Sequence, residues 1–187
     1  MIIRKAKTED ATAIANCLFL AMEDIAYQLC GENDADRAKS FLKHFVELEN
    51  NQYSYQNCWV ITENDQVVGA MNVYDGVKLA ELREPIFNYI ETIQNRKFFI
   101  EDETESGEFY IDCIAINPDQ QGKGIGANAL NFLIDEYVVK NNQILGLLVD
   151  EENPNAKRLY LKLGFQVVGI KTLAGKTMEH LQMNKRY

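Results

Sequence analysis

The sequence is poor in the residues that build metal sites and disulfide frameworks. Its 187 residues include only four cysteines and two histidines, and no two cysteines form a C-x-x-C pair. Cysteines so scattered are typical of buried free thiols rather than of a structural zinc site. We therefore expect no metal ion. The residues concerned are Cys17, Cys30, Cys58, Cys113, His44 and His180.

The chain also lacks a long hydrophobic run. The apolar stretch at residues 17–22 is far shorter than the roughly 18 residues that a membrane-spanning helix needs. No secretory signal is visible, because the first charges follow only two apolar residues and no small-residue cleavage site comes after them. We expect a cytoplasmic protein with no membrane partner.

An excess of positive charge is absent too. The chain has 19 basic and 28 acidic residues, a formal net charge of −9. Nucleic acid requires a basic face, so this balance disfavours a nucleic-acid partner. A cationic small molecule or a basic peptide suits an acidic protein better, although acidic charge also serves solubility alone. The length and the average composition, 47% hydrophobic and 25% charged, predict one globular domain over residues 1–187.

Hydrophobic periodicity predicts a strand, two helices, an antiparallel hairpin with an Asn-Asp turn at 64–65, and then a β-α-β-α-β run with a final strand. This order is typical of a mixed α/β sheet covered by helices. Strands are expected over residues 2–6, 59–62, 67–73, 109–116, 144–149, 165–170 and 177–183, and helices over 8–30, 34–49, 125–140 and 154–163.

Local signals predict where two of the helical segments begin and end. Thr8 is expected to cap the first helix, which then continues unbroken to a stop at Gly31. Pro85 is expected to break the weakly helical segment 77–94, or to start a turn there. In the last helix, Asn153 is the expected N-cap and Gly164 the left-handed C-terminal residue.

A glycine-rich loop, Gln-Gly-Lys-Gly-Ile-Gly at residues 121–126, lies between a predicted strand and a predicted helix. Glycines at such a place let backbone N–H groups surround an anion at the helix N-terminus. The loop does not match the P-loop pattern, and its last interval differs from that of G-x-G-x-x-G. Taken alone, it is equally a flexible turn or a phosphate site.

Two motifs together resemble the GNAT family of acetyl-CoA-dependent N-acetyltransferases. The cofactor loop of that family reads [Q/R]-x-x-G-x-[G/A], and Gln121, Gly124 and Gly126 match it. Its second signature, near N-x-x-A-x-x-L-Y-x-K-x-G-F, is similar to residues 153–165. The resemblance implies a GNAT fold, with a mixed and mostly antiparallel central sheet flanked by helices. It also implies an enzyme that transfers an acetyl group from acetyl-CoA directly to a primary amine.

The resemblance implies which residues hold acetyl-CoA. Backbone N–H groups of the loop would bind the pyrophosphate, and the side chain of Lys123 is either a charge partner or solvated. The pantetheine arm would pair with the strand before the loop, and one amide there would polarise the thioester carbonyl. Asn153 would touch the cofactor as well as cap its helix. The implied set is Ile114, Ala115, Ile116, Gln121, Gly122, Lys123, Gly124, Ile125, Gly126, Ala127 and Asn153.

Tyr160 occupies the tyrosine of the second motif. By resemblance it is the general acid that protonates the departing thiolate of coenzyme A, whose ordinary pKa near 8.5 requires only modest help. From helix spacing alone, Tyr160 would instead be a core tyrosine on an amphipathic helix. The motif match favours the catalytic role.

Asp112 is the candidate base that takes a proton from the amine, whose pKa lies near 10. Strand alternation predicts that Asp112 shares a face with Ile114 and Ile116 and that Cys113 points the other way. An aspartate of ordinary pKa is a poor base, so this role requires a raised pKa or a water relay; otherwise Asp112 is a solvated or substrate-binding carboxylate. Glu108 and His44 are the alternatives. A covalent route through Cys113 is disfavoured, because no histidine is close to it in sequence.

No sequence motif marks the residues that bind the acceptor. The acidic residues at 101–108 are either an attraction for a cationic amine or an ordinary solvated surface. The sequence therefore predicts an N-acetyltransferase whose partner is a small-molecule or peptide amine. The alternatives are a noncatalytic acyl-CoA-binding sensor or interaction module, against which the presence of Tyr160 argues, and a transferase for longer acyl donors. A homodimer is the oligomer to test, since family members are often dimers.

Overall fold

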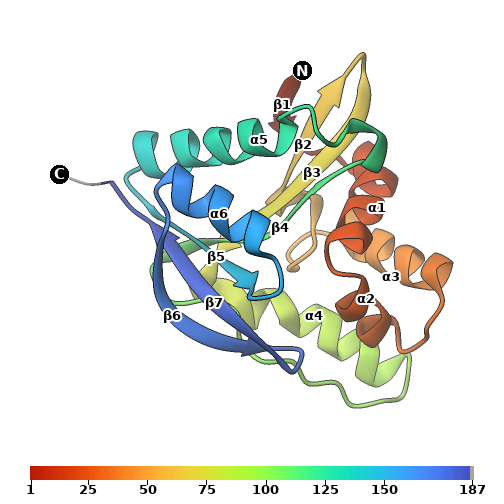
Figure 1. Ribbon diagram of the computed structural model, residues 1–187. Coiled ribbons are helices and arrows are strands. Elements are labelled where there is room, and N and C mark those ends of the chain that lie inside the picture. The colour runs from red at the N-terminus through yellow and green to blue at the C-terminus, as the bar shows by residue number, and fades with distance from the viewer. Residues whose placement is uncertain (186–187) are drawn as a thin grey trace.

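The protein is built on one seven-stranded sheet, seen in a computed structural model that describes residues 1–185 (Figure 1). The strand order is β1-β2-β3-β4-β5-β7-β6, and every neighbouring pair is antiparallel except β4 with β5. The predicted mixed, mostly antiparallel sheet is confirmed. The strands are β1 (Ile2–Lys5), β2 (Cys58–Glu63), β3 (Gln66–Asp75), β4 (Glu108–Ile116), β5 (Ile144–Asp150), β6 (Gln166–Leu173) and β7 (Lys176–Met183).

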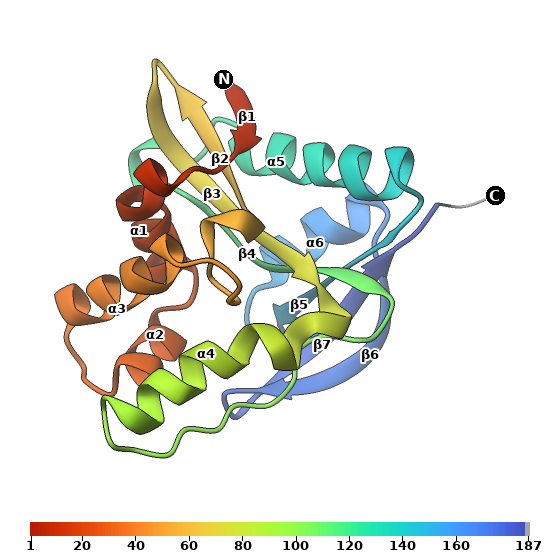
Figure 2. The ribbon, with the colours of Figure 1, turned by 180° about the vertical axis from the view of Figure 1, so that it is seen from behind.

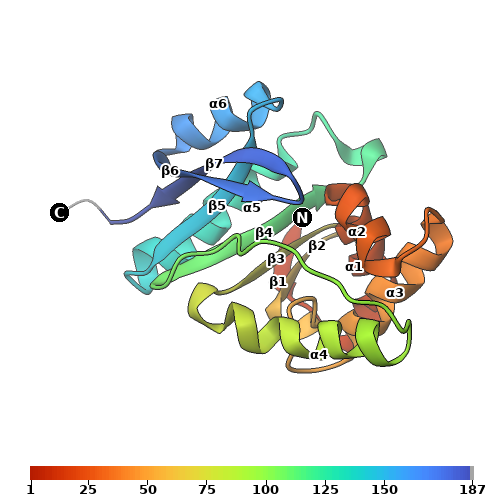
Figure 3. The ribbon, with the colours of Figure 1, turned by 90° about the horizontal axis from the view of Figure 1, so that it is seen from below.

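Helices cover both faces of the sheet (Figures 2 and 3). One face carries α1 (Ala11–Ala21), α2 (Glu23–Cys30), α3 (Ala35–Glu47) and α4 (Leu79–Thr92), and the other carries α5 (Ile125–Leu133) and α6 (Pro154–Leu163). A π-helical segment, Ile134–Lys140, extends α5. A large apolar cluster lies on each face between the sheet and these layers, and a small third cluster joins α4 to β3 and β4. Among residues 1–185, no single helix is long and apolar enough to cross a membrane.

The predicted first helix is in fact two helices. They meet at Met22, whose backbone leaves the helical region (φ −140°, ψ 49°), and their axes are bent by 110°. The bend keeps Leu18 of α1 and Leu29 of α2 both buried in the same core, where a straight helix would carry one of them away. The expectation that Thr8 caps the helix is also wrong, because it is the carboxylate of Asp10 that accepts the hydrogen bond from the Lys7 N–H (2.8 Å).

Pro85 does not break its segment, since α4 runs through it. Leu82, Ile86 and Ile90 form a buried face that holds the helix against the core. Pro85 lies on the opposite, exposed side, where the Glu81 carbonyl that loses its helical partner is available to water. The prediction failed because burial of the apolar face outweighs the loss of one hydrogen bond.

A buried carboxylate requires the glycine at position 146 of β5. Glu108 is 1% exposed, and its Oε2 lies 2.9 Å from Nε2 of His180 and 2.7 Å from Nε2 of Gln182. A Cβ at Gly146 would lie 1.9 Å from the same oxygen. The acidic stretch therefore contains a carboxylate that holds strands together.

We expect Gly146→Ala to destabilise the protein by about 1–3 kcal/mol, because the added methyl group must displace this buried cluster. Chemical denaturation measures the effect. The control is Gly169→Ala in β6, where an added Cβ meets nothing within 4 Å and the stability should change by less than about 0.5 kcal/mol. Equal stabilities of the two variants would contradict the role given to Gly146.

Candidate active site

The site begins where β4 and β5 separate. Their parallel pairing ends at Ile111 and Leu147, although the strands continue to Ile116 and Asp150 (Figure 1). The backbone of residues 112–116 therefore faces this opening without a ladder partner from β5. An extended ligand with amide groups can pair with such an edge.

A β-bulge at Asp112 changes the alternation of β4. Asn72 of β3 pairs with Cys113, whereas the next residue, Val73, pairs with Ile111, so Asp112 is an extra residue. As a result, Ile114 packs in the cluster under α5, whereas Asp112 contacts residues on the face covered by α1–α4. The prediction that Asp112 shares a face with Ile114 and Ile116 is wrong, because the extra residue of a bulge interrupts the alternation of side chains along the strand.

Cys113 lies in the buried cluster on the side of α1 and α3, the same side as Asp112, which corrects its predicted position too. Burial raises the pKa of the Cys113 thiol well above its usual range and raises that of Cys17 to about 11. A thiolate is the reactive form of cysteine. These thiols are therefore poor nucleophiles.

A cleft of about 420 Å³ lies between the end of β4, the glycine loop and α6. Of the residues expected to hold acetyl-CoA, all but Ala115, Lys123 and Asn153 line it. Ala115 is buried on the opposite face of the sheet, and the Lys123 ammonium donates to Gln120 Oε1 (2.7 Å). The cleft is lined by Ile114, Ile116, Gln120, Gln121, Gly122, Gly124, Ile125, Gly126, Ala127, Leu130, Ala156, Leu159 and Tyr160.

The loop conformation leaves backbone donors available. Gly122 and Gly124 both have φ +77°, a left-handed conformation that favours glycine, and a Cβ on either would project into open space. The first hydrogen bond of α5 joins Asn128 N–H to Gly124 C=O (3.1 Å), so the N–H groups of the three residues between them are not used by the helix. An anion at this helix N-terminus would be bound by these groups.

Tyr160 lies where the cleft meets a second depression. Its side chain lines both, and its ring packs edge-on against Phe165 with centroids 5.9 Å apart. No hydrogen bond to its hydroxyl is made by residues 1–185. Burial raises the pKa of the Tyr160 phenol, so the hydroxyl keeps its proton at neutral pH.

The second depression is a groove of about 810 Å³ between α1 and α2, the ends of β4 and β5, and the β6–β7 hairpin. Carboxylates dominate its charge, and its one lysine, Lys176, is paired with Asp24 (3.1 Å). A groove with this charge attracts a cationic ligand. The carboxylates are those of Glu23, Asp24, Asp112, Asp150 and Glu152. Asn153 also lines the groove, and its Oδ1 accepts from Ala156 N–H (3.2 Å), which confirms the predicted cap of α6.

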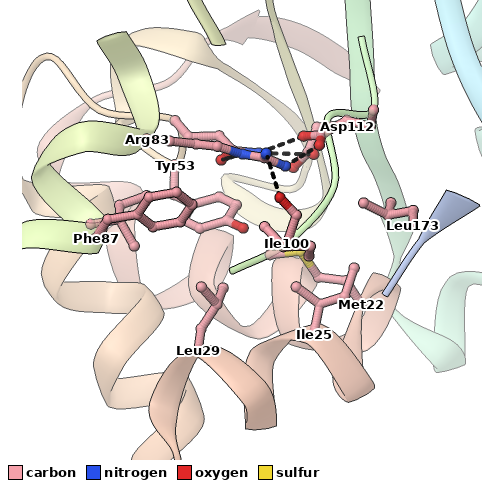
Figure 4. Close-up of a pocket in the computed structure, with 12 residues that line it drawn as sticks. Met22, Ile25, Leu29, Tyr53, Arg83, Phe87, Ile100, Asp112 and Leu173 are labelled. Carbon is pink, nitrogen blue, oxygen red and sulfur yellow. Dashed lines mark hydrogen bonds and ion pairs between the residues drawn. The ribbon is translucent and has the colours of Figure 1, made fainter. Parts of the chain in front are cut away.

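Asp112 lines both this groove and a cavity of about 20 Å³, which Figure 4 shows. A cavity of this size can hold one water molecule but no substrate, so an amine must reach Asp112 from the groove. Oδ2 of Asp112 is buried and receives no hydrogen bond from residues 1–185. Burial, together with the negative charge of Glu103, raises the pKa of Asp112 to about 7.

Sequence reasoning missed the buried polar residues around Asp112, which are Gln52, Tyr74, Arg83 and Glu103. They come from four separate segments of the chain, and no sequence pattern marks them. Glu103 belongs to the acidic stretch 101–108. One alternative for this stretch was a solvated surface, but the side chain of Glu103 is buried, with 1% exposed. Of the two alternative bases, Glu108 is bound to His180 inside the fold and His44 stacks against Tyr89, and neither lines the groove.

Comparison with known proteins gives consistent results. The profile of the Acetyltransferase (GNAT) family matches residues 26–165. Spermidine N(1)-acetyltransferase of Escherichia coli (strain K12) is 28% identical over 142 residues, which are 68% of this chain and 69% of that protein. A crystal structure of an acetyltransferase, 28% identical, superposes with a TM-score of 0.83 over 98% of this chain and 99% of that one. An N-acetyltransferase from Staphylococcus aureus Mu50, 23% identical, has the same fold, with a TM-score of 0.86 over 98% and 100% of the two chains.

Proposed function

The chain belongs to the GNAT acetyltransferase family and is an N-acetyltransferase, and we propose that it transfers the acetyl group of acetyl-CoA to a primary amine of a cationic small molecule. The observation that carries this proposal is the position of Tyr160, which lines both the cleft beside the glycine loop and the acidic groove. We take residues 1–187 as a single domain, because all seven strands belong to one sheet.

The cleft fits acetyl-CoA in two respects. Unused N–H groups of residues 125–127 suit the pyrophosphate, and the edge of β4 at residues 114–116 that β5 leaves unpaired suits the amides of the pantetheine arm. Bound acetyl-CoA would supply an activated thioester whose carbonyl lies near this edge. Lys123 donates to the neutral amide of Gln120, so its ammonium keeps its charge and its other N–H donors for the pyrophosphate.

Two residues of the groove, Asp112 and Tyr160, would handle two protons, and Tyr160 also lines the cleft. The acceptor enters as an ammonium, and Asp112 takes its proton, which frees the nitrogen lone pair for attack on the carbonyl carbon. When the carbon–sulfur bond breaks, the Tyr160 hydroxyl gives its proton to the departing thiolate. A base of pKa about 7 and an acid that stays protonated are suited to these roles at neutral pH.

The acidic groove favours an acceptor with more than one positive charge. A polyamine fits this requirement, and the Escherichia coli relative is a spermidine acetyltransferase. A second ammonium would bind the carboxylates of Glu23 and Asp24 while the first lies near Asp112. Lys176, which now pairs with Asp24, would be displaced by that second ammonium.

Acetyl transfer to a panel of amines tests the proposal. We expect mass spectrometry to find monoacetylated spermidine, with kcat/KM at least about tenfold higher than for propylamine and falling as salt screens the groove. Calorimetry in the same samples measures acetyl-CoA binding. Equal rates for both amines would contradict a preference for an acceptor with more than one positive charge, and binding without any product would favour the sensor alternative.

A further inference from the structure

We infer that Arg83 and Glu103 are positioning residues, whose buried ion pair leaves Asp112 as the one group of this network that takes up and releases a proton (Figure 4). The inference rests on the proposed function, because it gives that function its base. Neither residue belongs to a GNAT motif, and neither lines the groove or the cleft.

Hydrogen bonding within the network is unequal. Glu103 Oε1 accepts from the Tyr74 hydroxyl (2.7 Å) and from Gln52 Nε2 (2.9 Å), and Glu103 Oε2 accepts from Arg83. The same two donors lie 3.4 Å from Asp112 Oδ1, and Asp112 Oδ2 has no partner. The hydrogen-bond donors therefore stabilise a negative charge on Glu103 more than one on Asp112.

The positive charge of Arg83 also favours Glu103 over Asp112. Buried Glu103 and half-buried Asp112 share one permanent cation, Arg83, which lies against Glu103. Arg83 is itself held by the carbonyl of Glu101 (3.1 Å) and by Asp102 (3.1 Å), so it cannot turn toward Asp112 without losing both. Arg83 is paired with Glu103, so an ionised Asp112 beside this pair would be a charge without a compensating cation.

Among residues 1–185, the other surroundings of Asp112 supply no cation that is free of an acidic partner. Met22 and Ile25 at the start of α2 and Leu173 of β6 are apolar. The neighbouring ionisable groups are the neutral, buried side chains of Tyr53, Tyr74, Tyr110, Cys58 and Cys113, all of whose pKa values are raised by burial. Across the groove lie Glu23, Asp24, Asp150, Glu152 and Lys176, the last bound to Asp24.

Carbon-13 NMR titration of the Asp112 carboxyl group, assigned with Asp112→Asn, tests the inference without using activity. Glu103→Gln removes the repulsion and leaves Arg83 paired only with the exposed Asp102, so the Asp112 midpoint should fall by at least one pH unit. Arg83→Gln should raise it. A purely structural role would not shift the midpoint in opposite directions.

Asp102→Asn is the matched control. Asp102 bonds to the same arginine, but its side chain is 82% exposed and does not contact Asp112, so the midpoint should stay within about 0.3 unit. A midpoint unchanged in Glu103→Gln would overturn the inference. If Arg83→Gln fails to fold, the contrast between Glu103→Gln and Asp102→Asn decides alone.

The same variants separate this inference from the proposed function. In Glu103→Gln, the acid limb of kcat/KM should move down with the NMR midpoint, which at pH 6 raises the ionised fraction of Asp112 about fivefold for a one-unit shift. An NMR shift without any acetyl transfer would leave the network intact and reject the enzymatic proposal. If the acid limb of the kcat/KM profile does not shift in Glu103→Gln although the NMR midpoint of Asp112 does, Asp112 is not the base.

Discussion

Replacing Tyr160 with phenylalanine lowers kcat by about 10- to 100-fold and leaves the affinity for acetyl-CoA nearly unchanged, if the phenol is the acid that protonates the leaving thiolate. The ring remains to pack against Phe165 and to line the cleft, so binding keeps its contacts. Only the hydroxyl is lost, and no residue among 1–185 uses it for folding. Steady-state kinetics gives kcat, and calorimetry gives the dissociation constant of acetyl-CoA.

Tyr27→Phe is the control for that experiment. Tyr27 also lines the groove, but its hydroxyl donates to Glu23 (2.9 Å) on the exposed rim of α2, and it does not line the cleft. Its replacement should change kcat by less than about twofold. A Tyr160→Phe enzyme as fast as wild type would remove Tyr160 from the mechanism.

Replacing Asp112 with asparagine lowers kcat/KM by a factor of about 10² or more, because the ammonium of the acceptor then has no base in contact with it. In the wild-type enzyme, activity rises with pH as Asp112 loses its proton, with a midpoint near its pKa of about 7. The variant should lose this limb of the pH profile. Asp119→Asn, which changes an exposed carboxylate bonded to Gln120, should keep both rate and profile.

Stability measurements distinguish a lost base from a damaged fold. The pKa of Asp112 is raised from 3.8 to about 7 on folding, so between these values the folded state holds more protons than the unfolded state. The stability of wild type therefore falls as pH rises through this window, and an asparagine does not contribute to that fall. The Tm of Asp112→Asn relative to wild type should be higher at pH 8 than at pH 5. A variant that is less stable at pH 8 than at pH 5, relative to wild type, would show that Asp112 is ionised and bonded in the fold.

Local signals in the sequence were sufficient for much of the fold. Asn153 caps α6 and Gly164 ends it with φ 108°, because a cap depends on backbone groups within three or four residues. The Asn64–Asp65 turn adopts left-handed φ values of 51° and 61°, as a tight hairpin requires. The glycine loop likewise precedes α5 as predicted.

Signals of that kind failed where distant segments decide the outcome. The bend at Met22 depends on which surface each half of the segment can bury, and the continuity of α4 through Pro85 depends on the apolar face beneath it. The bulge at Asp112 depends on the register between β3 and β4. None of these is encoded within a window of a few residues.

The sequence by itself thus determined the family, the order of the elements and the two motifs, because these rest on short-range patterns along the chain. Only the tertiary structure decided what Asp112 can do. Its pKa depends on burial and on Glu103, its hydrogen bonds on Gln52 and Tyr74, and its access on the groove. Those partners lie 9 to 60 residues away in sequence. Only folding brings them next to Asp112, and exclusion of water then strengthens the electrostatic interactions between them.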